Sequence, residues 1–132
     1  MVVVDSSVWI DYLRRTDSDA GRRLDDLLER HEVLMTGVVL AEVLQGASGE
    51  RDHVRLESAL EAAAYVEVTR AAWVRAGRLS RELRGSGQAV PLTDLIIAAI
   101  AVEGDHELFT FDPDFQRVPG LRLYDWKGGA HA

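Results

Sequence analysis

Four acidic positions stand in segments that are otherwise apolar, and each follows or begins a candidate strand or helix. Asp5 ends the valine run in "MVVVDSSVWI", Glu42 lies inside "TGVVLAEVLQG", and Asp94 lies inside "VPLTDLIIAAIA". In "FTFDPDF" an apolar run leads into Asp112, with Asp114 two residues later. Carboxylates that pack together repel one another, and a divalent cation relieves that repulsion. Because every donor would be an oxygen, the set favours Mg²⁺ or Mn²⁺, and carboxylate-bound metals of this kind commonly serve phosphoryl chemistry.

Each acid also has a purely structural interpretation. Asp5 could cap the helix that follows it, and Asp94 suits the first turn of a helix, where the dipole favours a negative charge. The Asp-Pro-Asp segment at 112–114 has good turn chemistry. Glu42 is the hardest to explain in this way, because its neighbours are apolar and no Lys or Arg lies within four residues of it in the sequence. An unpaired buried carboxylate is very costly, so Glu42 points most strongly to a site.

The segments that must position these acids alternate between short apolar runs and helical patterns. We predict strands over residues 1–4, 32–35, 65–68, 107–111 and 121–124. We predict helices over residues 8–15, 20–30, 37–47, 50–64, 70–84 and 91–103, with helix caps at Ser6 or Ser7, Ser18 or Asp19, Thr36 and Thr69. That alternation predicts an α/β fold with a parallel sheet of about four or five strands, covered by helices on both faces. Ligands of such sheets bind outside the carboxyl ends of the strands, which is where Asp5 would lie.

Length and composition place the chain among ordinary globular proteins. Its 132 residues fit one domain, and 47% of them are hydrophobic and 28% charged. We expect no secretory signal and no membrane span, because no basic segment precedes the first apolar run and no later run approaches the ~20 residues of a span. The lack of cysteine suits a reducing, cytoplasmic setting.

The net charge of −7 argues against a protein that holds nucleic acid by its overall charge. Three alternatives follow: nucleic acid is not the partner, the contact with it is local, or bound cations invert the local charge. A local contact has one candidate, because Arg75, Arg78 and Arg81 repeat every three residues near one face of a predicted helix. The structural alternative for these arginines is a solvated helix surface.

The order of the acids resembles that of the PIN domain, in its small bacterial toxin branch of VapC-like ribonucleases. The matching segments are "VVVDSSVWIDYL", "LAEVLQG", "PLTDLIIAAIA" and "FTFDPDFQRVPGLRLY", which together extend over nearly the whole chain. Two departures leave the acids intact. Gly37 stands where a serine is usual, and Phe111 stands where a more polar residue is common.

The resemblance implies a PIN-like three-layer α/β/α fold over residues 1–125, followed by a flexible tail over 126–132. It implies a Mg²⁺-dependent endoribonuclease, with Mn²⁺ as a substitute, that cleaves RNA phosphodiester bonds by a metal-activated water. It also implies a toxin that is neutralised by a cognate protein antitoxin, whose tail blocks the acidic pocket, and a homodimer.

The resemblance further implies a role for each acid. Asp5 and Asp94 are the firmest metal ligands, and Glu42 completes the ligand set or orients the attacking water. Asp112 binds the metal directly or through water, and whether Asp112 or Asp114 is the fourth acid stays open. Ser6 matches the small hydroxyl residue that the family has near the metal.

Two other classes of function compete with the nuclease. One is a non-catalytic PIN-like interaction module, whose acidic pocket binds a basic segment of a partner. The other is a phosphotransfer protein with Asp5 as the nucleophile. Dehalogenase-like enzymes of that class have a second aspartate two residues after the first, where this chain has Ser7.

Overall fold

The computed structural model describes residues 1–15 and 17–127, which are built around a sheet of five parallel strands. The strands are β1 (Val2–Val4), β2 (Val33–Thr36), β3 (Ala64–Val66), β4 (Glu107–Phe109) and β5 (Arg122–Leu123), in the sheet order β3-β2-β1-β4-β5. Val3 of the central strand lies opposite Leu34 of β2 on one side and Leu108 of β4 on the other. Every residue of β1 is buried, as expected for a parallel strand that is covered on both faces. The predicted parallel sheet is therefore confirmed.

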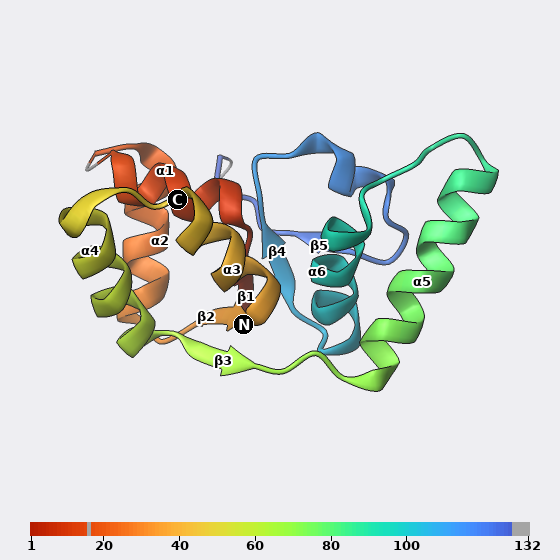
Figure 1. Cartoon of the computed structure of the whole chain (residues 1–132), viewed down its shortest axis with the longest axis horizontal. Coiled ribbons are helices and arrows are strands. Elements are labelled where there is room, and N and C mark those ends of the chain that lie inside the picture. The colour runs from red at the N-terminus through yellow and green to blue at the C-terminus, as the bar shows by residue number, and fades with distance from the viewer. Residues whose placement is uncertain (16, 128–132) are drawn as a thin grey trace.

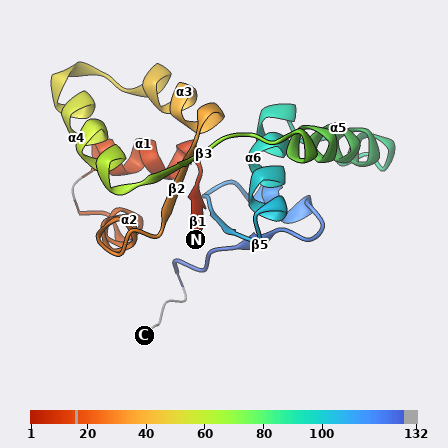
Figure 2. The same ribbon diagram turned by 90° about the horizontal axis from the view of Figure 1, so that it is seen from below.

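Helices connect the strands and cover both faces of the sheet (Figure 1). They are α1 (Ser6–Arg14), α2 (Asp19–Glu29), α3 (Gly37–Gly46), α4 (Gly49–Ala62), α5 (Arg70–Gly85), α6 (Leu92–Glu103) and the 3-10 helix η1 (Pro113–Arg117). Helix α1 packs against α2, α3 and α4, whereas α6 packs against β1, β4 and α5. In Figure 2, α1, α2 and α4 lie on one side of the strands and α5 and α6 on the other, which gives three layers.

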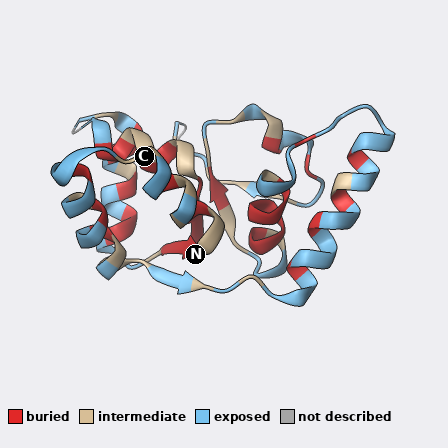
Figure 3. Cartoon of the chain, viewed as in Figure 1, coloured by how far each residue is buried: buried red, intermediate tan, exposed pale blue. Residues whose placement is uncertain are grey.

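Helix α6 lies at the centre of the core, next to the sheet (Figure 3). Residues 95–101 are all buried, because the sheet covers one side of this helix and α5 covers another. A helix that is covered on several sides is apolar all round, so a charged residue in its first turn is conspicuous. Trp9, Phe109 and Phe115 are the largest fully buried side chains.

Three of the four predicted helix caps agree with the structure, although Thr36 holds the N-cap position of α3 without a side-chain hydrogen bond. The side chains of Ser18 and Thr69 accept hydrogen bonds from the backbone N–H groups of Gly21 and Ala72. The predicted cap at Ser6 or Ser7 is wrong, because α1 begins at Ser6 and Asp5 holds the N-cap position. The Asp5 side chain makes no capping hydrogen bond. Ser6 and Ser7 form the start of α1, directly after the end of β1.

The segment after β4 is more ordered than the predicted turn. Pro113 begins η1, and the Asp112 carboxylate accepts a hydrogen bond from the backbone N–H of Asp114 at 2.9 Å. The preset φ of proline favours the first turn of a helix, which the sequence-based interpretation as a simple turn overlooked.

The predicted tail from 126 to 132 begins inside the folded part. The Trp126 ring stacks on Phe109 with a centroid distance of 6.1 Å, so the packed chain extends at least to Trp126. The rest of the tail, at 128–132, lies outside the described residues. Within the described ranges, no helix is both long and apolar enough to cross a membrane.

Candidate active site

The four predicted acids line one cavity at the carboxyl ends of the central strands. Asp5 follows β1, Asp112 follows β4, Glu42 lies on α3 and Asp94 lies in the first turn of α6. The cavity has a volume of about 560 Å³, and its other lining residues are Ser6, Ser7, Ile10, Gln45 and Gly46. Because β4 pairs with β1, Asp5 from near the N-terminus and Asp112 from near the C-terminus meet at the carboxyl ends of these neighbouring strands.

Asp5 is buried and is held by two hydroxyl groups. Ser7 Oγ donates to Asp5 Oδ2 at 3.0 Å, and Thr110 Oγ1 donates to the same oxygen at 2.8 Å. The Asp5 backbone N–H donates to the Phe109 carbonyl at 2.9 Å, which joins the end of β1 to the end of β4. The simple capping interpretation of Asp5 is therefore wrong, because its carboxylate is oriented by side chains that surround the cavity.

Ser7 and Thr110 are site residues that the sequence-based interpretation missed. Besides binding Asp5, Thr110 Oγ1 accepts the backbone N–H of Asp112 at 3.0 Å, and Ser7 Oγ accepts that of Phe111 at 3.3 Å. Each hydroxyl thus ties the carboxylate at the end of β1 to the segment after β4. The sequence showed only that a serine follows Asp5 by two residues and that a threonine precedes Asp112 by two residues.

Glu42 carries an unsatisfied oxygen next to the cavity. Its Oε1 is buried and has no hydrogen-bond partner, and no ion pair found in the described part of the chain includes it. Burial raises the pKa of Glu42; the Ser6 hydroxyl lowers it and the negative charge of Asp5 raises it further. The predicted hydroxyl residue Ser6 therefore acts beside Glu42, and Ser7 acts beside Asp5.

Asp94 is the acid whose ionisation the site disfavours most clearly. Its pKa is raised from 3.8 to about 6, first by burial and then by the negative charges of Asp5, Asp112, Glu42 and Asp114. A stabilising helix N-terminus does not account for this environment, because the dipole would favour the charged form. Among the described residues that line the cavity, none is a Lys, Arg or His that could neutralise the negative charge of the four acids.

The structure separates the two aspartates at 112 and 114. Asp112 lines the cavity, whereas Asp114 does not and instead forms an ion pair with Arg117 at 3.6 Å. Asp114 is also the weakest of the four acids that raise the Asp94 pKa. This geometry favours Asp112 as the fourth acid of the cavity.

The donor set fits a hard divalent cation in chemistry. Among the side chains that the structure describes, no three Asp, Glu, His or Cys groups are placed so that they could hold a metal ion as they stand. The acids nevertheless provide only oxygen donors, and their negative charges repel one another. One of these oxygens, Glu42 Oε1, has no hydrogen-bond partner in the described structure. A cation bound here would have to draw these side chains together, and it would neutralise the charge that raises the Asp94 pKa.

The predicted arginine contact lies apart from this cavity. Arg75 and Arg78 line a different cavity of about 720 Å³ between α5 and the end of α6, and Arg75 is paired with Glu103. Arg81 lines neither cavity. An RNA contact at these arginines therefore stays a prediction, and within one copy of the chain they do not border the acids.

The raised pKa of Asp94 makes the stability of the metal-free protein depend on pH. Between the ordinary value of 3.8 and about 6, the folded state keeps a proton that the unfolded chain has lost. The free energy of unfolding therefore falls as the pH rises through this window. We expect Asp94→Asn to be more stable than the wild type at about pH 7.5, and the difference to shrink towards about pH 4.

Urea denaturation in EDTA at the two pH values measures this difference. A stability difference between Asp94→Asn and the wild type that does not change with pH would contradict the expected result.

The comparisons with known proteins agree with this geometry. The family model of the PIN domain matches residues 2–121. VapC ribonuclease Mb1587 of Mycobacterium bovis is 30% identical to the chain over 122 residues, which cover 89% of this chain and 91% of that protein. Ribonuclease VapC21 of Mycobacterium tuberculosis is 31% identical over 102 residues, or 75% of this chain and 74% of that protein.

Two solved structures share the fold. VapBC2 from Rickettsia felis, bound to a DNA fragment from its promoter, superposes with a TM-score of 0.81 at 22% identity, over 94% of this chain and 98% of that one. DNA-bound VapBC from Salmonella typhimurium gives the same TM-score and identity over 95% and 97% of the two chains. At this identity the similarity concerns the fold alone.

Proposed function

The chain belongs to the PIN-domain family, in its VapC-like branch, and on that premise we propose that it is a Mg²⁺-dependent endoribonuclease and the toxin of a toxin–antitoxin pair. The observation that carries the proposal is the convergence of Asp5, Glu42, Asp94 and Asp112, from four separate elements, on one cavity. If each acid had only a local role as a helix cap or turn residue, the four acids would have no reason to line the same cavity. The curated relatives named above are ribonucleases, which supports the same activity here.

The four acids would hold Mg²⁺, which when bound supplies an electrophile for the phosphoryl oxygens and makes water a better nucleophile. Asp5 is ready for this role, because Ser7 and Thr110 fix its carboxylate. Asp94, with a pKa of about 6, gives up its proton more readily once a cation offsets the charge of its neighbours.

Glu42 is the residue best suited to handle the attacking water. Its Oε1 is buried without a hydrogen-bond partner in the described structure, so a water that enters beside Glu42 would find an acceptor that no other group uses. Burial raises its pKa, which brings the carboxylate closer to the basicity needed to take a proton near neutral pH. We therefore assign Glu42 to orienting the water that attacks the scissile phosphorus.

A cognate antitoxin and a homodimer complete the proposal. An acidic cavity fits a basic segment of a partner, and the solved structures of similar fold include VapBC complexes. Apolar side chains that lie exposed at Leu44, Trp73, Val74 and Leu92 offer surface for a second copy of the chain.

The direct test is cleavage of a mixed RNA pool by the purified protein, free of antitoxin, in Mg²⁺, Mn²⁺ or EDTA. We expect cleavage with either metal and none in EDTA. A folded protein that cleaves no RNA with any metal would favour the non-catalytic interaction module instead. Binding of basic peptides to the same protein would then support the interaction module, and a lack of binding would argue against it.

Removing the hydroxyl that holds Asp5 is expected to weaken the enzyme without unfolding it. Thr110→Val keeps the side-chain shape but loses the hydrogen bond donated to Asp5 Oδ2 and the one accepted from the Asp112 backbone N–H, while Ser7 still donates to Asp5. We expect a ~10–100-fold loss of kcat/KM, the usual effect of losing a group that orients a metal ligand. Thr110→Ser, which keeps the hydroxyl, is the matched control and should stay near the wild-type rate. Wild-type activity of Thr110→Val would show that Asp5 needs no such support.

A further inference from the structure

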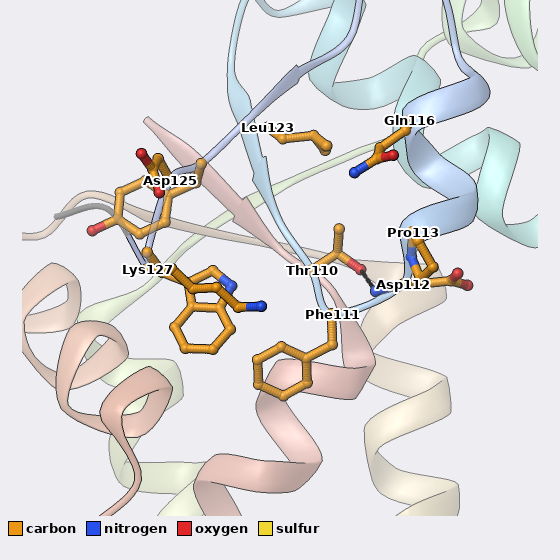
Figure 4. Close-up of a pocket in the computed structure, with 10 residues that line it drawn as sticks. Thr110, Phe111, Asp112, Pro113, Gln116, Leu123, Asp125 and Lys127 are labelled. Carbon is orange, nitrogen blue, oxygen red and sulfur yellow. Dashed lines mark hydrogen bonds between the residues drawn. The ribbon is translucent and has the colours of Figure 1, made fainter.

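A second cavity adjoins the acidic one and has a different chemical character (Figure 4). It has a volume of about 590 Å³ and shares Asp112 with the acidic cavity. Its other lining residues are Thr110, Phe111, Pro113, Gln116, Leu123, Tyr124, Asp125, Trp126 and Lys127. A ligand in this cavity would therefore lie beside Asp112, one of the four acids of the proposed catalytic site.

Two aromatic rings form the wall of this cavity next to the acids. Phe111 and Trp126 meet edge to face, with their ring centroids 5.3 Å apart. The Phe111 side chain is 39% exposed, although it directly precedes the site residue Asp112. The same two rings also line a neighbouring cavity of about 400 Å³, so they are accessible from two sides.

The folded core holds these rings in place. Trp126 stacks on the fully buried Phe109, and Phe109 in turn contacts Tyr124 with a centroid distance of 5.0 Å. Phe111 is held in turn by its edge-to-face contact with Trp126, and an exposed ring that is held in this way can bind a flat ligand without losing much conformational freedom.

We propose that this second cavity binds the base of an RNA nucleotide that flanks the scissile phosphate, stacked on the exposed Phe111 ring, with the Trp126 ring at its edge. The inference rests on the proposed ribonuclease function. Every base presents a flat π-face, and stacking on exposed aromatic side chains is a general way to hold single-stranded RNA. Because Asp112 lies in the wall, a neutral base fits this cavity better than a phosphate does.

Polar groups at the edges of the cavity complete the recognition of a nucleotide. Gln116 provides an amide that can both donate to and accept from the edge of a base. Lys127, with its Nζ 5.4 Å from the centre of the Trp126 ring, places a positive charge where the nucleotide's own phosphate can be met. Phe111 and Trp126 thus act as substrate-binding residues, with Gln116 and Lys127 around them.

The test uses the purified full chain and an RNA whose cleavage position the wild type has first defined. We expect Phe111→Leu and Trp126→Leu each to raise KM and lower kcat/KM by about tenfold, within the range for one stacked base. Trp126→Phe, which keeps an aromatic face, should retain most of the activity. Tyr65→Leu is the matched control, because it removes an exposed aromatic ring from β3, which lines neither this cavity nor the acidic one, and leaves an apolar side chain there.

An RNA that lacks one base identifies the contact directly. Substrates with an abasic nucleotide on either side of the scissile phosphate should lose about the same factor with the wild type. For the position that occupies the cavity, the abasic substrate and Phe111→Leu should cause losses that do not add. A merely structural role of Phe111 would leave the two losses additive and would overturn the inference.

The outcomes separate the two proposals. If the wild type cleaves no RNA, the proposed ribonuclease function is wrong, and the base-binding proposal that rests on it is wrong as well. If the wild type cleaves RNA and the Phe111→Leu and Trp126→Leu variants both keep the wild-type KM, only the proposal of a base-binding cavity is overturned. Folding of the variants is checked by thermal unfolding, and Phe111→Leu is the safer variant because its side chain is the more exposed.

Discussion

Asp94→Asn is expected to abolish RNA cleavage while leaving the fold intact. The change keeps the shape of the side chain but removes a charge from the centre of the acid cluster, where Asp5, Glu42 and Asp112 also converge. Losing a group that merely orients a ligand typically costs ~10–100-fold, so losing a proposed ligand should lower kcat/KM by more than that. Initial rates on the defined RNA substrate in Mg²⁺ measure the loss.

A second readout does not depend on activity. Mg²⁺ should raise the melting temperature of the wild type, because a ligand that binds only the folded state stabilises it. The same Mg²⁺ should raise the melting temperature of Asp94→Asn much less, whereas in EDTA at neutral pH the variant should melt above the wild type. Equal Mg²⁺ shifts in the two proteins would contradict the assignment of Asp94 as a ligand.

Asp19→Asn is the matched control for this experiment. Asp19 also lies in the first turn of a helix, but its side chain is 82% exposed, pairs with Arg22 and does not line the acidic cavity. Its replacement should cost only ~0.3–1 kcal/mol of stability, the usual effect of a favourable charge at a helix N-terminus. RNA cleavage and the Mg²⁺ shift should be unchanged.

Phe109→Ala is expected to have the largest effect on stability of the changes considered. Phe109 is fully buried on β4, beside the central strand, and contacts both Tyr124 and Trp126. Replacing a buried phenylalanine with alanine typically costs ~3–5 kcal/mol, because it removes apolar contacts and leaves a cavity. Urea or thermal denaturation measures the loss, which is a large part of the ~5–15 kcal/mol of a typical domain.

The matched control for this variant lies two residues later on the same segment. Phe111→Ala removes the same number of atoms from a side chain that is 39% exposed, so its cost should be below ~1 kcal/mol. The two variants thus separate a phenylalanine that builds the core from one that faces a cavity. Similar losses of stability for both would contradict the proposal that the Phe111 ring is available to a ligand.

The acidic cavity lowers the stability of the metal-free protein. Asp5, Glu42 and Asp94 are buried or half-buried acids, and their burial and mutual repulsion raise two of their pKa values. Replacing Asp94 should therefore stabilise the metal-free fold at neutral pH but destroy its chemistry. A proposed antitoxin that inserts a basic segment would relieve the same repulsion, which connects inhibition with stabilisation.

The parallel sheet, most of the helices and the acids could be predicted from the amino-acid pattern alone. β1 is a continuous apolar run because it is buried on both faces, and Asp5 directly follows it. Glu42 and Asp94 stood out because each interrupts a strongly apolar helix, where a charge is costly. Such signals are local: they depend on a few neighbouring residues and on the period of the helix or strand.

The groups that surround the acids could be identified only from the folded arrangement of the chain. Thr110 donates to Asp5 across 105 positions of sequence, and no local pattern encodes a hydrogen bond over that separation. The same holds for the position of Asp112 inside the acidic cavity and of Asp114 outside it, and for Trp126, whose ring packs against the core although its neighbours resemble a tail. It holds as well for Arg75 and Arg78, whose helical spacing was clear but whose cavity lies apart from the acids. The physical reason is that these contacts depend on the order of the strands in the sheet, which places β4 beside β1 and brings distant segments together.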